Sequence, residues 1–295
     1  MNAPNIDDEL NALKLAATQQ LNKGMITSVE YGVSHRARTK KKTAENFFMT
    51  LNAFPDMLAI PDQYNLGSVS LDFIGMGNMV AYDSQGMVRD GFYDLTLEES
   101  SYASNQWNVK EDVTTMFAMA NLETVIAGKE VTGNIGVRYI QTDQSSNAFA
   151  QSGGSLIRQT VKHDYSNTLP SMNLRVALDD KQTVRLGVAQ TMSRPRMDEM
   201  NASFGIGVNL VPDQYGNYIA AGGGNTSLEP KEALGIDLTY ENYFADDGYF
   251  SIALYHKDLK EWIFDGAAEI DVSDFLEASG QSTPDGSTTA TVNGK

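Results

Sequence analysis

The stretch LPSMNLRVALDDKQTVRLGVAQTMSRP, residues 169–195, alternates apolar and polar side chains on both sides of a short acidic turn. The apolar positions recur at every second residue before the turn and again after it: Met172, Leu174, Val176, Val184, Leu186, Val188. A period of two is that of a strand, whereas a helix repeats every 3.6 residues. The sequence therefore predicts two antiparallel strands joined at Asp179-Asp180-Lys181.

Other two-faced segments repeat this pattern along the chain. They cover residues 25–38, 131–142, 234–241 and 250–255, with a weaker example at 107–122. Each has aliphatic or aromatic side chains on one face and small, polar or charged ones on the other. Residues 10–20 fit either a helix or a strand, and we favour a strand that leads into a turn at 22–24.

The connections between these segments alternate in length. Short turns are predicted near 21–24, 126–130, 179–182 and 245–248, and long links at 39–106, 143–164, 194–230 and from 265 onward. Long unstructured loops are uncommon in compact soluble domains, but a transmembrane β-barrel has short turns at one rim and long loops at the other. We therefore expect an all-β, antiparallel transmembrane barrel segment of about seven or eight strands in hairpins. Its aliphatic face would contact lipid and its polar face water or a plug.

Composition narrows the classes of function. A formal net charge of −16 argues against a nucleic-acid partner, which needs a basic surface. The basic run Arg36, Arg38 and 40–42 is a local exception, interpreted as a solvated strand end, with an anion contact as the alternative. The absence of cysteine excludes disulfides and thiolate metal sites. No apolar run is long enough for a transmembrane helix, and the N-terminal segment lacks the features of a secretory signal.

Motifs for chemistry are missing from the sequence. His35, His163 and His256 are far apart and have no metal-ligand spacing. No nucleophile elbow, P-loop or dinucleotide-binding loop occurs. We therefore expect no catalytic residue, no metal site and no cofactor.

Several segments, in this order, resemble the barrel of TonB-dependent outer-membrane receptors, most closely the group often linked to carbohydrate uptake. They are WNVKED (107–112), GNIGVRYIQT (133–142), the opening stretch, NTSLEP (225–230) and ALGIDLTYENYFADDGYFSIALYHKDLKEWI (233–263). The resemblance runs from about Gly24 to Phe264, excluding much of 43–106. One departure is Gly224-Asn225-Thr226, where the family usually has Gly-Asn-Pro.

The resemblance implies a barrel of roughly twenty-two strands with short periplasmic turns and long extracellular loops. An N-terminal plug closes such a barrel, which imports a scarce ligand, an oligosaccharide or a siderophore-like molecule, across the Gram-negative outer membrane with energy from TonB. We expect residues 1–295 to supply part of this barrel, without the plug, the TonB box and the last strands. The partners would be outer-membrane lipid, TonB through the plug region, and the ligand.

Two sets of residues are candidates for the receptor's internal surfaces. Aromatic residues of the long loop at 194–230, namely Phe204, Tyr215 and Tyr218, are predicted to stack on the ligand. Charged residues of the polar strand face are predicted to face the lumen: Arg138, Arg175, Arg185, Asp237 and Glu241.

Two other classes stay open at this point. A small autonomous membrane barrel of eight strands has an interior filled by side chains, so it would serve as an anchor or adhesin and not as a transporter. A soluble β-sandwich that binds glycans would explain the aromatic loops. An enzyme has no supporting constellation of residues.

Overall fold

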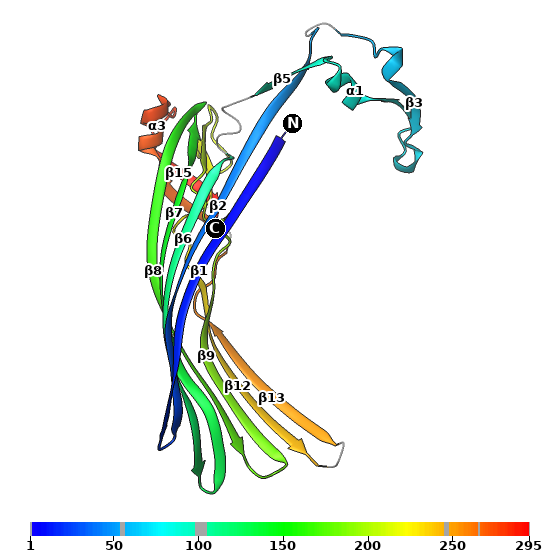
Figure 1. The fold of residues 1–295 in the computed structure, drawn as a ribbon. Helices are drawn as coiled ribbons and strands as arrows, with labels where there is room; N and C mark the ends of the chain where they lie inside the picture. Colours follow the sequence, from blue (N-terminus) through cyan, green and yellow to red (C-terminus); the bar gives the residue numbers. More distant parts are fainter. Residues whose placement is uncertain (1, 54–56, 98–104, 245–247, 265, 295) are drawn as a thin grey trace. The chain divides into compact units, whose positions relative to one another are not determined.

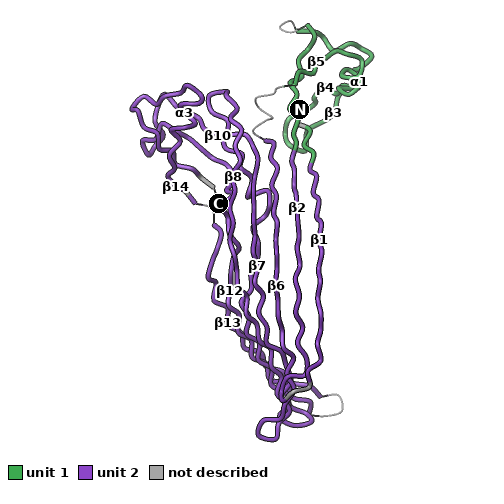
Figure 2. The backbone as a smooth tube through the Cα atoms, turned by 60° about the vertical axis from the view of Figure 1, so that its left-hand side comes forward, with its two compact units in different colours: residues 1–5, 43–103 green, residues 6–42, 104–295 purple. Residues whose placement is uncertain are grey.

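The computed structural model describes residues 2–53, 57–97, 105–244, 248–264 and 266–294. Contacts divide the chain into two compact units (Figure 2). The first unit comprises residues 1–5 and 43–103, and the second comprises residues 6–42 and 104–295.

Eight long strands of the described residues form the main sheet. In sheet order they are β1 (Asn2–Lys23), β2 (Ile26–Leu51), β6 (Trp107–Ile126), β7 (Lys129–Ser152), β8 (Ser155–Ala177), β9 (Gln182–Ser193), β12 (Lys231–Tyr243) and β13 (Tyr249–Leu259). Every neighbouring pair from β2 to β13 is antiparallel, and Figure 1 shows β6 to β13 side by side. The predicted all-β, antiparallel fold is confirmed, and residues 10–20 belong to a strand.

The short turns lie where the sequence predicts them. Residues 24–25, 127–128 and 178–181 connect successive strands of the sheet. Residues 245–247 lie outside the described residues, but Tyr243 pairs with Tyr249 across the last hairpin.

The predicted long link at 143–164 is wrong. β7 and β8 continue through it and meet at Gly153-Gly154, with Ser152 paired to Ser155. Polar residues on both faces hide the strand period, but alternate β7 residues from Thr142 to Ser152 are buried, partly under segment 194–230. Tertiary burial therefore decides the conformation here. The two glycines, at φ +55° and +82°, were the local signal of a tight hairpin.

The remaining long links contain short elements. Segment 194–230 holds β10 (Phe204–Val208) and β11 (Ile219–Gly223), and the last residues hold β14 (Gly266–Asp271), α3 (Ser273–Ser279) and β15 (Thr289–Gly294). β10 pairs with the end of β7 in parallel, and β11 pairs in parallel with β15. A core from these elements joins them to α3: Ile206, Ile219, Val272, Leu276, Ala290.

In chain order, the short elements of the first unit follow β2 and precede β6. It contains η1 (Asp62–Tyr64), β3 (Asn65–Ser70), η2 (Asp72–Ile74), β4 (Asn78–Tyr82), α1 (Ser84–Arg89) and β5 (Tyr93–Leu97). β5 pairs with the end of β2, so the link predicted from residue 39 begins later, after Leu51. Tyr64 donates a 2.8 Å hydrogen bond to Asp90. Within the described residues, no helix has the length and apolar character needed to cross a membrane.

The β6–β7 turn allows a test of the hairpin geometry. Ala127 and Gly128 have φ values of +51° and +73°, and a type I′ turn requires positive φ at both positions. Asparagine adopts this region more readily than alanine, so we expect Ala127→Asn to raise the free energy of unfolding by about 1 kcal/mol. Urea unfolding of the refolded chain in detergent, followed by tryptophan fluorescence, measures the change. Gly128→Ala should lower stability, and equal effects of the two substitutions would contradict this geometry.

Candidate functional site

The ladder registers divide the residues of the main sheet between two faces. Phe117 of β6 lies opposite Arg138 of β7, which lies opposite Leu169 of β8. The same face continues through Ala189 of β9 to Gly235 of β12. Because strand side chains alternate with a period of two, each residue of these ladders belongs to one face. We call the face that carries Arg138 the charged face and the opposite one the apolar face.

A groove of about 970 Å³ lies on the charged face. The ionisable residues that line it are mostly basic: Lys14, Glu30, Arg36, Arg38, Glu111, Arg138, Arg194. Arg38 binds Asp8 through Nε (2.9 Å) and Nη2 (2.6 Å), and Arg194 Nε lies 3.6 Å from a carboxylate oxygen of Glu111. Arg36 and Arg138 are exposed and form no ion pair with the described residues. The groove therefore offers free guanidinium groups, which suit carboxylates and phosphates.

The interpretation of the basic run at 36–42 as a strand end is wrong. β2 pairs with β6 throughout this run, as far as the pair Lys42–Trp107, and then continues to Leu51. Arg38 lies opposite Glu111, and opposite charges at such positions stabilise the pair of strands. The sequence pattern missed Glu111 and Arg194 as groove residues, and Asp8 as the partner of Arg38, because the paired residues are distant in the sequence.

The five residues predicted to face the lumen share the charged face. Arg138 lines the groove, whereas the other four lie nearer the short turns. Arg175 lies directly opposite Arg185, a repulsive arrangement. Glu241 offsets it, because its carboxylate is 3.0 Å from Nε of Arg185. Asp237 lies opposite Gly187 on the same face, in the row of side chains next to that of Arg175 and Arg185.

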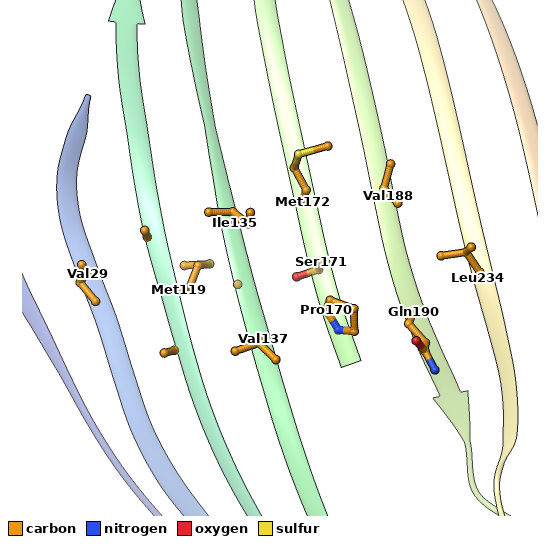
Figure 3. Close-up of a pocket in the computed structure, with 13 residues that line it drawn as sticks. Val29, Met119, Ile135, Val137, Pro170, Ser171, Met172, Val188, Gln190 and Leu234 are labelled. Atoms are coloured by element: carbon orange, nitrogen blue, oxygen red, sulfur yellow. The ribbon is translucent and has the colours of Figure 1, made fainter. Parts of the chain in front are cut away.

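The apolar face leaves large hydrophobic side chains exposed. These include Val33, Met116, Ile135, Val137, Ile236, Leu238, Ile252 and Leu254. A hollow of about 570 Å³ lies among the side chains of this face, where Ile135, Val137 and Met172 line it (Figure 3). Ala118 and Ala120, opposite Val137 and Ile135 in the ladder, also line it and fill little space. A contiguous exposed apolar surface of this kind marks contact with an apolar partner or a membrane.

Pro170 ends the ladder between β8 and β9. Proline has no N–H to donate, and the β8–β9 pairing stops beside it while the β7–β8 pairing continues. Beyond this point the carboxylate of Glu232 accepts hydrogen bonds from the side chains of Asn167 and Gln190. Side-chain bonds thus connect β8 to β9 and β12 where the β8–β9 ladder is missing, while β9 and β12 remain paired through the backbone.

The loop aromatics predicted to bind ligand do not form one cluster. Phe204 is partly buried, with its ring centroid 5.9 Å from that of Phe275. Tyr215 is 80% exposed in a turn held by Asp213, whose carboxylate accepts the backbone N–H groups of Tyr215 and Asn217. These bonds, that from Asn217 first, hold the pKa of Asp213 below its ordinary value. Tyr218 follows on the same loop and is half-buried.

A third concavity, the loop pocket, lies between β10, β14 and the segments 223–230 and 261–264, with a volume of about 670 Å³. Phe204 lines it together with Trp262 and Phe264, whereas Tyr215 and Tyr218 do not. Its carboxylates are those of Glu229 and Glu261. The sequence patterns did not identify Trp262 or Phe264, because both follow a regular strand and carry no motif.

The histidines are dispersed in the structure. His163 Nε2 is 2.9 Å from a carboxylate oxygen of Glu229, and His35 contacts the hydroxyl of Thr114. Across the part of the chain that the structure describes, no three His, Cys, Asp or Glu side chains come together as metal ligands would.

The chain is similar to one protein family and to several solved structures. Residues 4–292 match the family model described as TonB dependent receptor-like, beta-barrel. No curated protein matches the sequence. Among solved structures, the siderophore receptors PiuA and PirA from Acinetobacter baumannii are 12% and 11% identical, with TM-scores of 0.47 and 0.40. A ferric enterobactin receptor (PfeA) mutant from Pseudomonas aeruginosa, in complex with enterobactin, is 12% identical with a TM-score of 0.40.

The alignments cover nearly all of this chain but a minor part of each structure. They span 98% of this chain and 34% of PiuA, 97% and 40% for PirA, and 98% and 40% for the PfeA mutant. The family match over residues 4–292 agrees with the two-faced antiparallel sheet. The chain belongs to the TonB-dependent receptor-like β-barrel family.

Proposed function

We propose that this chain forms part of the wall of an outer-membrane barrel that takes up a scarce ligand with energy delivered by TonB. The observation that carries the proposal is the separation of a charged face from an exposed apolar face on the same antiparallel strands. A barrel wall requires this separation, since one side contacts hydrocarbon and the other a wet lumen. The family match supports a role in transport.

The edges of the sheet support a place in a larger barrel. Among the described residues, β1 pairs only with β2, and β13 pairs only with β12. Open edges of long strands are unfavourable, and an autonomous eight-stranded barrel would pair β1 with β13. A soluble sandwich would cover the apolar face with a second sheet, and the described residues place none there. We therefore propose that residues 1–295 are a partial barrel domain, with the plug that contacts TonB supplied from outside it.

Within this receptor we propose separate roles for the two candidate sets. Arg138, Arg175, Arg185, Asp237 and Glu241 face the lumen, because they share the face that holds the groove. Phe204, Tyr215 and Tyr218 contact the ligand from the long loop, where Tyr215 is already exposed to solvent. The ligand is an oligosaccharide or a siderophore-like molecule.

Lipid-depth quenching tests the proposed location. We expect a fluorophore attached at Val188 or Leu174, on the apolar face, to be strongly quenched by a bilayer-embedded quencher. Labels at the adjacent Ala189 and Asn173 serve as matched controls on the charged face and should be weakly quenched. Equal quenching on both faces, or none on either, would exclude the membrane barrel.

A lysine on the apolar face should impair assembly, whereas a lysine on the charged face should be tolerated. Leu186→Lys puts an ammonium in hydrocarbon, at a cost of about 2–4 kcal/mol near the bilayer midplane, so assembly into the outer membrane should fall. Gly187→Lys should be tolerated, because a Cβ there meets nothing closer than 3.4 Å and Asp237 is a neighbour. Heat-modifiable migration of the assembled receptor on SDS gels compares the two variants. Equal assembly would contradict the assignment of faces.

The loop aromatics can be tested by uptake. Replacing both Tyr215 and Tyr218 with Ala should weaken ligand uptake several-fold and leave assembly intact, because Tyr215 is exposed and the half-buried Tyr218 lies in a loop outside the strands of the main sheet. Uptake by cells that express the receptor, normalised to its surface level, provides the measurement. Unchanged uptake would remove both residues from the ligand site.

A further inference from the structure

The loop pocket presents aromatic rings that are unusually accessible for side chains lining a concavity. Trp262 is 58% exposed and Phe264 is 72% exposed. Between them, Ile263 packs against the core that contains Trp107 and Met200, so the segment is anchored while its two neighbours remain outside. Exposed rings on an anchored segment form a preorganised apolar surface, which needs little ordering when a ligand binds.

The orientation of Trp262 is also restrained from the side. The ammonium of Lys231 lies over the indole ring, 4.4 Å from its centroid, in a cation–π contact. Phe204 contributes a third ring to the lining, and its own packing on Phe275 fixes it. The pocket is thus lined by three rings from separate elements, each held by a neighbouring side chain or anchored segment.

The charges that line the pocket have one sign. Glu229 and Glu261 are its ionisable lining residues, and no Lys or Arg lines it. Glu229 contacts His163, whereas Glu261 is exposed and forms no side-chain ion pair with the described residues. Asn225 and Ser227 add an amide and a hydroxyl to the lining. With a net charge of −16 on the whole chain, an anionic ligand would be repelled on approach. The ammonium of Lys231 lies over the Trp262 ring but is not among the residues that line the pocket, so the lining itself offers an anion no lysine or arginine.

We propose that the loop pocket binds an uncharged oligosaccharide. The C–H faces of the sugar rings stack on Trp262 and Phe264, and the hydroxyl groups donate hydrogen bonds to the carboxylates of Glu229 and Glu261. This inference rests on the proposed receptor function and names its ligand class. It also assigns ligand contacts to Trp262 and Phe264, in addition to Phe204.

Tryptophan fluorescence of the full chain in detergent tests the ligand class. The chain has two tryptophans, and Trp107 is buried, so a ligand-induced change reports mainly Trp262. The probes are neutral hexasaccharides (maltohexaose, xylohexaose and laminarihexaose), the anionic hexagalacturonate and the cationic chitosan hexamer. We expect a saturable change with at least one neutral probe and none with hexagalacturonate. A saturable fluorescence change with hexagalacturonate, or with the chitosan hexamer alone, would overturn the proposal. The absence of a saturable change with every probe would also overturn it.

Matched variants test the residues, with calorimetric titration as a second measurement. Phe264→Ala should weaken binding of the active neutral probe about tenfold, as expected when a stacking ring is lost. Phe73→Ala, which removes an 81% exposed phenylalanine from the first unit, should leave binding unchanged. Glu261→Gln keeps a hydrogen-bonding oxygen but removes a charge, so binding of hexagalacturonate relative to the neutral probe should increase. Equal affinities of Phe264→Ala and Phe73→Ala would exclude Phe264 from the site.

The depth-quenching experiment on Val188 and Leu174 is independent of this result. Loss of saccharide binding together with intact quenching from lipid would reject the ligand class and leave the receptor function standing. Loss of quenching from lipid would reject the receptor function itself.

Discussion

The structure depends on one constraint, the uninterrupted register of the antiparallel ladder across β6, β7 and β8. From Ile126–Lys129 at the turn, β6 and β7 pair without a break to Trp107–Ala148. A slip of one residue would exchange the two faces, placing Arg138 among exposed aliphatic side chains and Tyr139 on the charged face. The separation of the faces, and with it the proposed barrel wall, therefore follows from backbone pairing as much as from side-chain chemistry.

The sequence predicts this ladder only where one face is clearly apolar. Residues 131–142 and 169–195 satisfy that condition, so the strands and their turns were recognisable. The second half of β7 does not, because the residues buried there against segment 194–230 are mostly small and polar. The groove and the loop pocket could not be predicted from local sequence patterns either, because each brings together residues that are far apart in the sequence. Asp8 and Arg38 are 30 residues apart, and Phe204 and Trp262 of the pocket are separated in the sequence by β12 and β13.

Buried polar groups connect the long loop to the sheet. Gln144 of β7 donates hydrogen bonds to the carbonyl groups of Thr226 and Leu228, and Ser146 accepts one from the backbone N–H of Ala202 (2.8 Å). A buried polar side chain is costly without a partner, so these bonds favour one position of the loop over others. The loop pocket is consequently built on a segment fixed to the barrel strands, which explains how a loop site can be preorganised.

The loop pocket and the groove differ in the chemistry of their lining, and this difference favours different partners. The loop pocket has carboxylates and rings, whereas the groove has the exposed guanidinium groups of Arg36 and Arg138. An uncharged ligand bound in the pocket has no anionic group to satisfy these arginines. They are then available to carboxylates of the segment that fills the lumen of the proposed receptor, and bidentate arginine–carboxylate pairs would fix its orientation against the wall. On this view the charged face contacts protein, and discrimination between ligands occurs at the loops.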